Sequence, residues 1–196
     1  MKIEKIMTGI LANNCYILTS EKNNCIIVDP GGETEKLKEM TKDCNNLIVL
    51  LTHGHVDHIA GCYGLSDTVY VHEDDLELLT DNEKNMANAL RIKCQPIENA
   101  KTFKDGDLIT LDDITLRVMH TPGHTKGSCC FVGDTFMLTG DTVFLGTYGR
   151  TDHYGGSYDE IQKSLKKVLS LNKDYLLYCG HGGNSRLFEE KQRYAL

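Results

Sequence analysis

Three histidines and one aspartate occupy six consecutive positions of the chain, a density that allows them to act together. His53, His55, Asp57 and His58 follow the largely apolar run 46–51, so they lie where a buried strand is expected to end. A cluster this dense repels itself when charged and is costly to bury without partners. Metal coordination removes both problems, because neutral imidazole and carboxylate are ordinary zinc ligands. The pattern therefore predicts a metal site rather than a solvated, histidine-rich loop.

Further candidate ligands stand elsewhere in the chain, each directly after a glycine that follows an apolar, strand-like run. The glycine gives the backbone freedom to turn the next side chain toward a common centre. A single histidine or aspartate after a strand is usually a turn residue, so only these residues taken together indicate a metal site. The candidates are His124, Asp141 and His181.

The order of these groups closely resembles the signature of the metallo-β-lactamase superfamily. That signature is His-x-His-x-Asp-His followed by Gly-His, Gly-Asp and Gly-His, and the chain contains all four parts between residue 13 and about residue 190. The resemblance implies an α/β fold, a four-layer αβ/βα sandwich. In this fold two mixed β-sheets pack face to face and helices cover the outer faces. Composition alone does not show this architecture.

The resemblance also implies two divalent metal ions in each chain. Nitrogen and carboxylate donors without a thiolate suit Zn²⁺ best, and Fe or Mn also fit. Asp29 follows the apolar run 25–28. In related proteins the aspartate at this place accepts a hydrogen bond from a ligand histidine and orients the ring; turn capping is the alternative. The implied ligands are His53, His55 and His124 for one ion, Asp57, His58 and His181 for the other, and Asp141 as the bridge between them.

The chemistry implied by this resemblance is hydrolysis. Two cations on one water lower its pKa from about 15.7 to about 7, which yields a metal-bridging hydroxide. Asp57 is expected to orient that hydroxide and to accept its proton. The stretch 140–144, followed by 149–152 and by Gly155 and Gly156, resembles the short, single-domain relatives of glyoxalase II. We therefore expect a binuclear metallohydrolase that cleaves a thioester of the S-acylglutathione type.

Several alternatives share the same motif. A persulfide dioxygenase would use a single iron on residues that match His53, His124 and Asp141, so the metal count separates the two hypotheses. Another ester or lactone hydrolase of the superfamily also fits. True β-lactamases of this motif lack the bridging aspartate and are exported, so Asp141 argues against them. A metal-binding or interaction module without catalysis is the non-enzymatic alternative.

The thiol half of the substrate is less well defined. Full-length glyoxalase II carries a C-terminal helical domain that binds glutathione, but only residues 182–196 follow His181 here. We therefore expect a single metallo-β-lactamase-like domain over residues 1–196. The nearest cationic candidates for binding an anionic group are Lys126, Arg150 and Arg186, and for Arg150 a structural ion pair is the favoured alternative.

The elements that must position these residues follow from the apolar patterning. The remaining histidines, His72, His120 and His153, are expected to form hydrogen bonds or to lie in loops rather than to bind metal. Strands are predicted at 2–8, 14–18, 25–28, 46–51, 68–71, 108–111, 114–119, 128–132, 136–138 and 175–179. Helices are predicted at 33–43, 58–62, 73–80, 83–92, 158–171 and 185–193.

Composition limits the partners and the compartment. The net charge of −7 argues against a general nucleic-acid binder. No apolar run approaches the roughly 18 residues of a membrane helix, and the first residues lack the core of a secretion signal. We therefore expect a cytoplasmic protein with a small-molecule substrate and without nucleic-acid or membrane partners; the oligomeric state stays open. The eight cysteines include no Cys-x-x-Cys pair and are expected to be reduced and buried.

Overall fold

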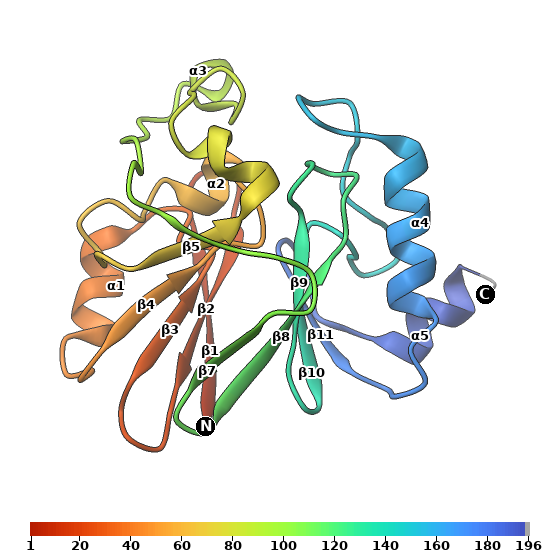
Figure 1. Ribbon diagram of the computed structural model, residues 1–196, viewed down its shortest axis with the longest axis horizontal. Helices are drawn as coiled ribbons and strands as arrows, with labels where there is room; N and C mark the ends of the chain where they lie inside the picture. The colour runs from red at the N-terminus through yellow and green to blue at the C-terminus, as the bar shows by residue number, and fades with distance from the viewer. Residues whose placement is uncertain (195–196) are drawn as a thin grey trace.

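The computed structural model describes residues 1–194, and the strands in this part of the chain form two six-stranded mixed sheets (Figure 1). The first sheet is antiparallel over its first three strands and parallel over the rest. It contains β1 (Lys2–Thr8), β2 (Asn13–Thr19), β3 (Cys25–Val28), β4 (Leu47–Leu50), β5 (Val69–His72) and β6 (Lys101–Phe103) in that order.

The second sheet is antiparallel except for one parallel pair, β10 with β11. Its strands, from one edge to the other, are β12 (Ser185–Arg186), β11 (Leu176–Cys179), β10 (Phe136–Gly140), β9 (Cys129–Val132), β8 (Ile114–His120) and β7 (Leu108–Leu111).

Helices cover the outer face of each sheet (Figure 1), so the predicted four-layer sandwich is confirmed. Among the described residues, no helix is both long enough and apolar enough to cross a membrane. The first sheet carries α1 (Thr34–Thr41), α2 (Val56–Ile59), the 3-10 helix η1 (Glu73–Leu79) and α3 (Ala87–Leu90), and the second carries α4 (Tyr158–Leu169) and α5 (Leu187–Arg193).

Alternation along the strands divides the apolar residues among three cores. On β2, Tyr16 and Leu18 point into the core between the two sheets, whereas Ile17 points toward the helices. This is the period-two pattern of a strand that is buried on both faces. Phe131 of β9 lies in the central core, and its ring centroid is 5.5 Å from that of Phe103 on β6. The packed cores fix the sheet edges from which the site residues project.

Several local predictions differ from the structure, mainly where patterning is weak. The helix predicted over 83–92 is restricted to Ala87–Leu90, and β6 was not predicted at all. The helix predicted over 73–80 is a 3-10 helix, and the short helix expected from residue 58 already begins at Val56. Short segments with mixed polarity take their conformation from the sheet beside them, because their own sequence gives little preference.

The expectation that all cysteines are unpaired is wrong for two of them. Cys25 begins β3 and Cys44 follows α1, and the fold brings them into a disulfide with a Cα–Cα distance of 6.0 Å. Neither lies in a recognisable spacing motif, so only the path of the chain through α1 brings them together. The other cysteines are buried with free thiols, as expected.

The core between the sheets should be sensitive to truncation. We expect Phe131→Ala to lower the free energy of unfolding by about 3–5 kcal/mol, because Phe131 is fully buried and its loss leaves a cavity. The matched control is Phe188→Ala, at a side chain that is 42% exposed, for which we expect a loss below about 1 kcal/mol. Urea unfolding of both variants measures the difference, and equal losses would contradict this core assignment.

Candidate metal centre

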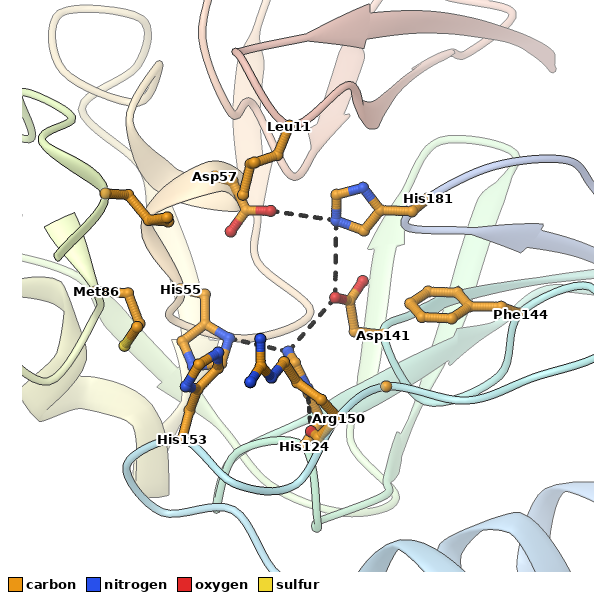
Figure 2. Close-up of a pocket in the computed structure, with 12 residues that line it drawn as sticks. Leu11, His55, Asp57, Met86, His124, Asp141, Phe144, Arg150, His153 and His181 are labelled. Carbon is orange, nitrogen blue, oxygen red and sulfur yellow. Dashed lines mark hydrogen bonds and ion pairs between the residues drawn. The ribbon is translucent and has the colours of Figure 1, made fainter.

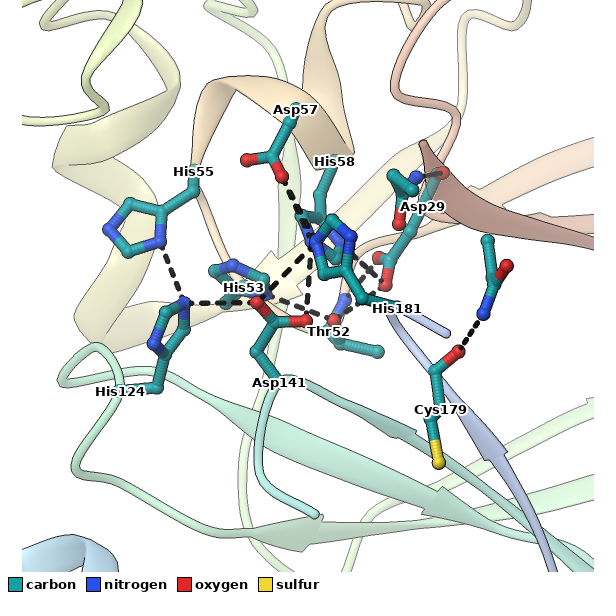
Figure 3. Close-up of polar contacts among 12 residues, drawn as sticks. Asp29, Thr52, His53, His55, Asp57, His58, His124, Asp141, Cys179 and His181 are labelled. Carbon is teal, nitrogen blue, oxygen red and sulfur yellow. Dashed lines mark hydrogen bonds and ion pairs between the residues drawn. The ribbon is translucent and has the colours of Figure 1, made fainter. Parts of the chain in front are cut away.

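The predicted ligands come from the ends of strands in both sheets and meet at one edge of the sandwich (Figure 3). His53 and His55 follow β4, whereas Asp57 and His58 lie in the α2 helix that comes next. The other ligands follow β8, β10 and β11 of the second sheet. The structure brings all seven side chains together in two groups, which a third group of His53, His58 and Asp141 connects. Within each group, the ligand atoms lie within 4.8 Å of one another. These side chains are His53, His55, Asp57, His58, His124, Asp141 and His181.

The first group joins the loop after β4 to the loop after β8. His53, His55 and His124 form this group, and all three are buried. Nδ1 of His55 lies 2.9 Å from Nε2 of His124. Burial, together with the neighbouring imidazoles, lowers the pKa of both His53 and His55, so these rings are neutral near pH 7. Neutral imidazole is the form that binds a metal.

The second group lies on the other side of the cluster. Nε2 of His181 is 3.1 Å from Oδ2 of Asp57 and 3.3 Å from Nε2 of His58. Burial lowers the pKa of His58, but the carboxylates of Asp141, Asp57 and Asp29 outweigh burial and raise it to about 10. A metal ion that binds His58 therefore has to displace a proton.

Asp141 lies between the two groups, as a bridging ligand would. Its Oδ2 is 3.4 Å from Nε2 of His124, and its Oδ1 is 3.4 Å from Nε2 of His58. The backbone that holds it is crowded: Gly140 has φ +47°, and a Cβ on Gly180 would lie 2.3 Å from Oδ1 of Asp141. Both glycines are therefore required for the carboxylate to reach this position.

Buried atoms without partners show that the side chains fit a metal. Oδ1 of Asp141 and Nε2 of His53 are buried and have no hydrogen-bond partner in the protein. The Thr52 hydroxyl donates to Asp29, so it accepts from Nδ1 of His53 at 3.2 Å and leaves the lone pair on Nε2. Unpaired buried acceptors are costly, and a divalent cation satisfies both of them.

Asp29 holds the base of the site at the place that the sequence suggested. Its Oδ2 accepts from Nδ1 of His58 at 3.0 Å and from the Thr52 hydroxyl at 2.6 Å, and its Oδ1 accepts from the Thr52 amide at 2.8 Å. On the other side, Nδ1 of His124 donates to the Arg150 carbonyl at 2.7 Å. Each bond turns the second ring nitrogen toward the centre and raises its basicity.

Asp75 is a functional residue that the sequence reasoning missed. It falls within the segment predicted as the helix 73–80, and in η1 it is fully buried, where burial raises its pKa. Its carboxylate accepts from the Gly54 amide at 2.9 Å, the Thr125 hydroxyl at 2.6 Å and the Gly127 amide at 2.6 Å. Asp75 therefore ties the loop of the first two ligand histidines to the loop of His124. No local sequence signal marks this role.

The other histidines are held outside the seven-residue cluster. His72 accepts from the Asp74 amide at 3.3 Å, His120 donates to the Lys126 carbonyl at 2.8 Å, and the two rings stack with centroids 4.0 Å apart. His153 instead lines the cavity beside the centre, where its ring centroid lies 5.8 Å from that of His55.

Of the three cationic side chains predicted to bind the substrate, one lines the cavity and two do not. Arg150 lines the cavity, but its guanidinium forms two hydrogen bonds with Asp152, both 2.7 Å long. Lys126 lies over the Tyr154 ring and outside this cavity, and Arg186 pairs with an aspartate in the loop between α4 and β11. Lys126 and Arg186 do not line this cavity, and their role in substrate binding stays a prediction.

Metal binding should depend on pH in a direction set by His58. We expect two divalent ions per chain, and an affinity that weakens by about tenfold per displaced proton for each pH unit below the His58 pKa of about 10. Elemental analysis gives the count, and calorimetric titration of chelator-treated protein at about pH 8 and about pH 6 gives the affinities. Equal affinities at both pH values would contradict a protonated His58 in the metal-free chain.

Removal of the Asp75 carboxylate should loosen both loops of the centre. We expect Asp75→Ala to lower the free energy of unfolding by roughly 3 kcal/mol or more, because it leaves two buried amides without acceptors. Metal affinity should fall with it. Asp74→Ala is the matched control, since Asp74 is the exposed neighbour. Chemical unfolding and metal titration test both variants, and similar behaviour would refute the positioning role.

Comparisons with known proteins agree with this geometry. The sequence model of the Metallo-beta-lactamase superfamily matches residues 8–181. Hydroxyacylglutathione hydrolase GloC from Haemophilus influenzae is 32% identical over 98% of this chain and 96% of that protein. The solved BLEG-1 B3 metallo-beta-lactamase has a TM-score of 0.87 at 30% identity, and the match covers 97% of each chain. TTHA1623 in a di-iron-bound form has a TM-score of 0.86 at 29% identity, over 97% of this chain and 98% of that one.

The family match covers most of the chain, and the fold of BLEG-1 is that of the structure described above. The chain belongs to the metallo-β-lactamase superfamily.

Proposed function

We propose that this chain is a binuclear metallohydrolase that cleaves thioesters of the S-acylglutathione type. The observation that carries the proposal is the place of Asp141, whose two oxygens face ligand histidines of both groups. This arrangement suits two metals that share one carboxylate. The activity named for the relative GloC, hydroxyacylglutathione hydrolase, supports the choice of substrate. Zn²⁺ is the metal we favour for these nitrogen and oxygen donors, and the di-iron form of TTHA1623 makes iron the second choice.

The ligands of this centre would be those predicted from the sequence, three for each ion and Asp141 shared. When bound, the metal pair supplies an activated water and polarises the carbonyl oxygen under attack. Burial raises the pKa of Asp57, but His58 and His181 outweigh burial and hold that pKa well below its usual range. Asp57 is therefore a carboxylate at neutral pH and can accept a proton from the attacking water. The cavity beside it, of about 500 Å³, gives an acyl group access to the site.

The test is an assay of purified, metal-loaded protein against a panel of substrates. We expect turnover of S-lactoylglutathione and other thioesters, with two metals per chain. Oxygen uptake on a persulfide, with one iron and no thioester turnover, would replace the proposal with a dioxygenase. Cleavage of a β-lactam without thioester turnover would instead indicate the activity named for BLEG-1.

The role of Asp57 can be separated from metal binding. We expect Asp57→Asn to lower kcat by roughly 100-fold or more, because the amide cannot accept the proton. The metal count should stay at two, since the other ligands remain. Asp67→Asn, at an exposed position away from the centre, is the control and should leave kcat unchanged. Full activity in Asp57→Asn would exclude Asp57 as the proton acceptor.

A further inference from the structure

Four apolar side chains line the cavity beside the metal centre. Figure 2 shows Leu11, Met86 and Phe144 on different sides of the cluster. Leu90 also lines this cavity. Ligand pockets of this size are usually apolar, with a few polar groups that fix orientation. Here the polar groups are those of the centre, together with two further polar side chains of the loop after Gly149, so the apolar side chains are free to select the rest of the substrate.

Three separate segments of the chain form these walls. The segment of Met86 and Leu90 and the segment of Phe144 each pack against a hydrophobic core. Met86 and Leu90 are four residues apart on one helical turn, where the Leu90 amide donates to the Met86 carbonyl at 3.0 Å. Both pack against the core under the helices of the first sheet. Phe144 packs against the corresponding core of the second sheet, and its ring centroid lies 6.0 Å from that of His181. Leu11 comes from the loop between β1 and β2 and is 43% exposed.

The charged side chains around the cavity also favour an apolar group in it. Among the described residues, Arg150 is the one cationic side chain, other than histidine, that lines it, and Asp152 already binds its guanidinium through two hydrogen bonds. A carboxylate carried on the acyl chain, seated against the apolar walls and away from the metals, would therefore lose its hydration without gaining a free cationic side chain. The charged part of a substrate is better placed toward solvent, and the apolar part against the walls.

We propose that this site prefers thioesters whose acyl group is an apolar chain, seated against Leu11, Met86, Leu90 and Phe144. This inference rests on the proposed thioester hydrolysis and specifies its substrate class. The polar thiol half then lies at the open side of the cavity, in water. Hydrolysis adds one water across the C–S bond, so the products are the fatty carboxylic acid and the free thiol. Each methylene that leaves water for these walls should favour the complex by about three- to fourfold.

The first experiment is a chain-length series on a single thiol. Metal-loaded protein is assayed with S-acetyl-, S-butyryl-, S-hexanoyl- and S-lactoylglutathione. We expect kcat/KM to rise along the series and to be at least tenfold higher for hexanoyl than for acetyl or lactoyl. A flat series, or a preference for lactoyl, would overturn the inference but leave the proposed hydrolysis standing. Absence of turnover for every thioester would refute the proposed function itself.

Two neighbouring residues provide a matched pair of variants. Leu11→Gln places a polar side chain in the wall, and we expect it to reduce the hexanoyl-to-acetyl ratio at least threefold. Ile10→Gln makes the same change one residue away, at a side chain that is 75% exposed and does not line the cavity, so the ratio should not change. Since both lie in an exposed loop, folding should survive either change. Equal ratios in the two variants would remove Leu11 from the wall.

A binding measurement tests the walls without catalysis. Calorimetric titration of the metal-loaded protein with acetate, butyrate and hexanoate compares carboxylates that differ only in chain length. We expect hexanoate to bind at least tenfold more tightly than acetate, and Met86→Gln to reduce that difference, whereas Met7→Gln, an exposed position on β1, should preserve it. Equal affinities for all three acids in the unmodified protein would overturn the inference.

Discussion

The structure depends on holding imidazoles and carboxylates together in a buried cluster where they cannot all keep their charges. Histidines within 2.9 Å and 3.3 Å of one another repel when protonated, and carboxylates lose their hydration when buried. Asp141 relieves part of this conflict by lying between the two histidine groups. A bound divalent metal would relieve the rest, because it would turn each unpaired acceptor into a ligand. The positions of the strand ends, the glycines beside them and the supporting hydrogen bonds all serve this cluster.

Two further buried carboxylates hold the cluster in place without belonging to it. Asp29 supports His58 and Thr52 from the end of β3, and Asp75 connects the loop after β4 with the loop after β8. Asp29 binds residues that follow strands of the first sheet, whereas Asp75 connects loops that belong to different sheets. Each accepts several hydrogen bonds, so its charge is compensated although it is buried. Each carboxylate accepts hydrogen bonds from both backbone amides and side chains of the ligand loops. Displacement of either carboxylate would therefore shift ligand histidines as well.

The centre and the cavity walls have different tasks. Proteins similar to this chain carry different activity names, hydroxyacylglutathione hydrolase for GloC and B3 metallo-beta-lactamase for BLEG-1. Because a shared fold does not set the substrate, we assign substrate choice to side chains around the centre, such as Leu11, Met86 and Phe144. These residues are distant in sequence and belong to a loop, a short helix and a strand-following turn. Substitutions at these wall residues leave the ligand set unchanged, because none of them is a predicted ligand.

The sequence by itself indicated the candidate ligands, and its resemblance to the metallo-β-lactamase superfamily implied the general fold. The pattern from His53 to His58 is local, and the glycine-preceded candidates follow clear apolar strands, so spacing and alternation were sufficient to single them out. Only the tertiary structure decided which distant groups meet. The link from Asp75 to Thr125, the disulfide and the cavity walls all join segments whose separation in sequence carries no local signal. Packing of the two sheets sets these contacts, because it fixes which loops share an edge.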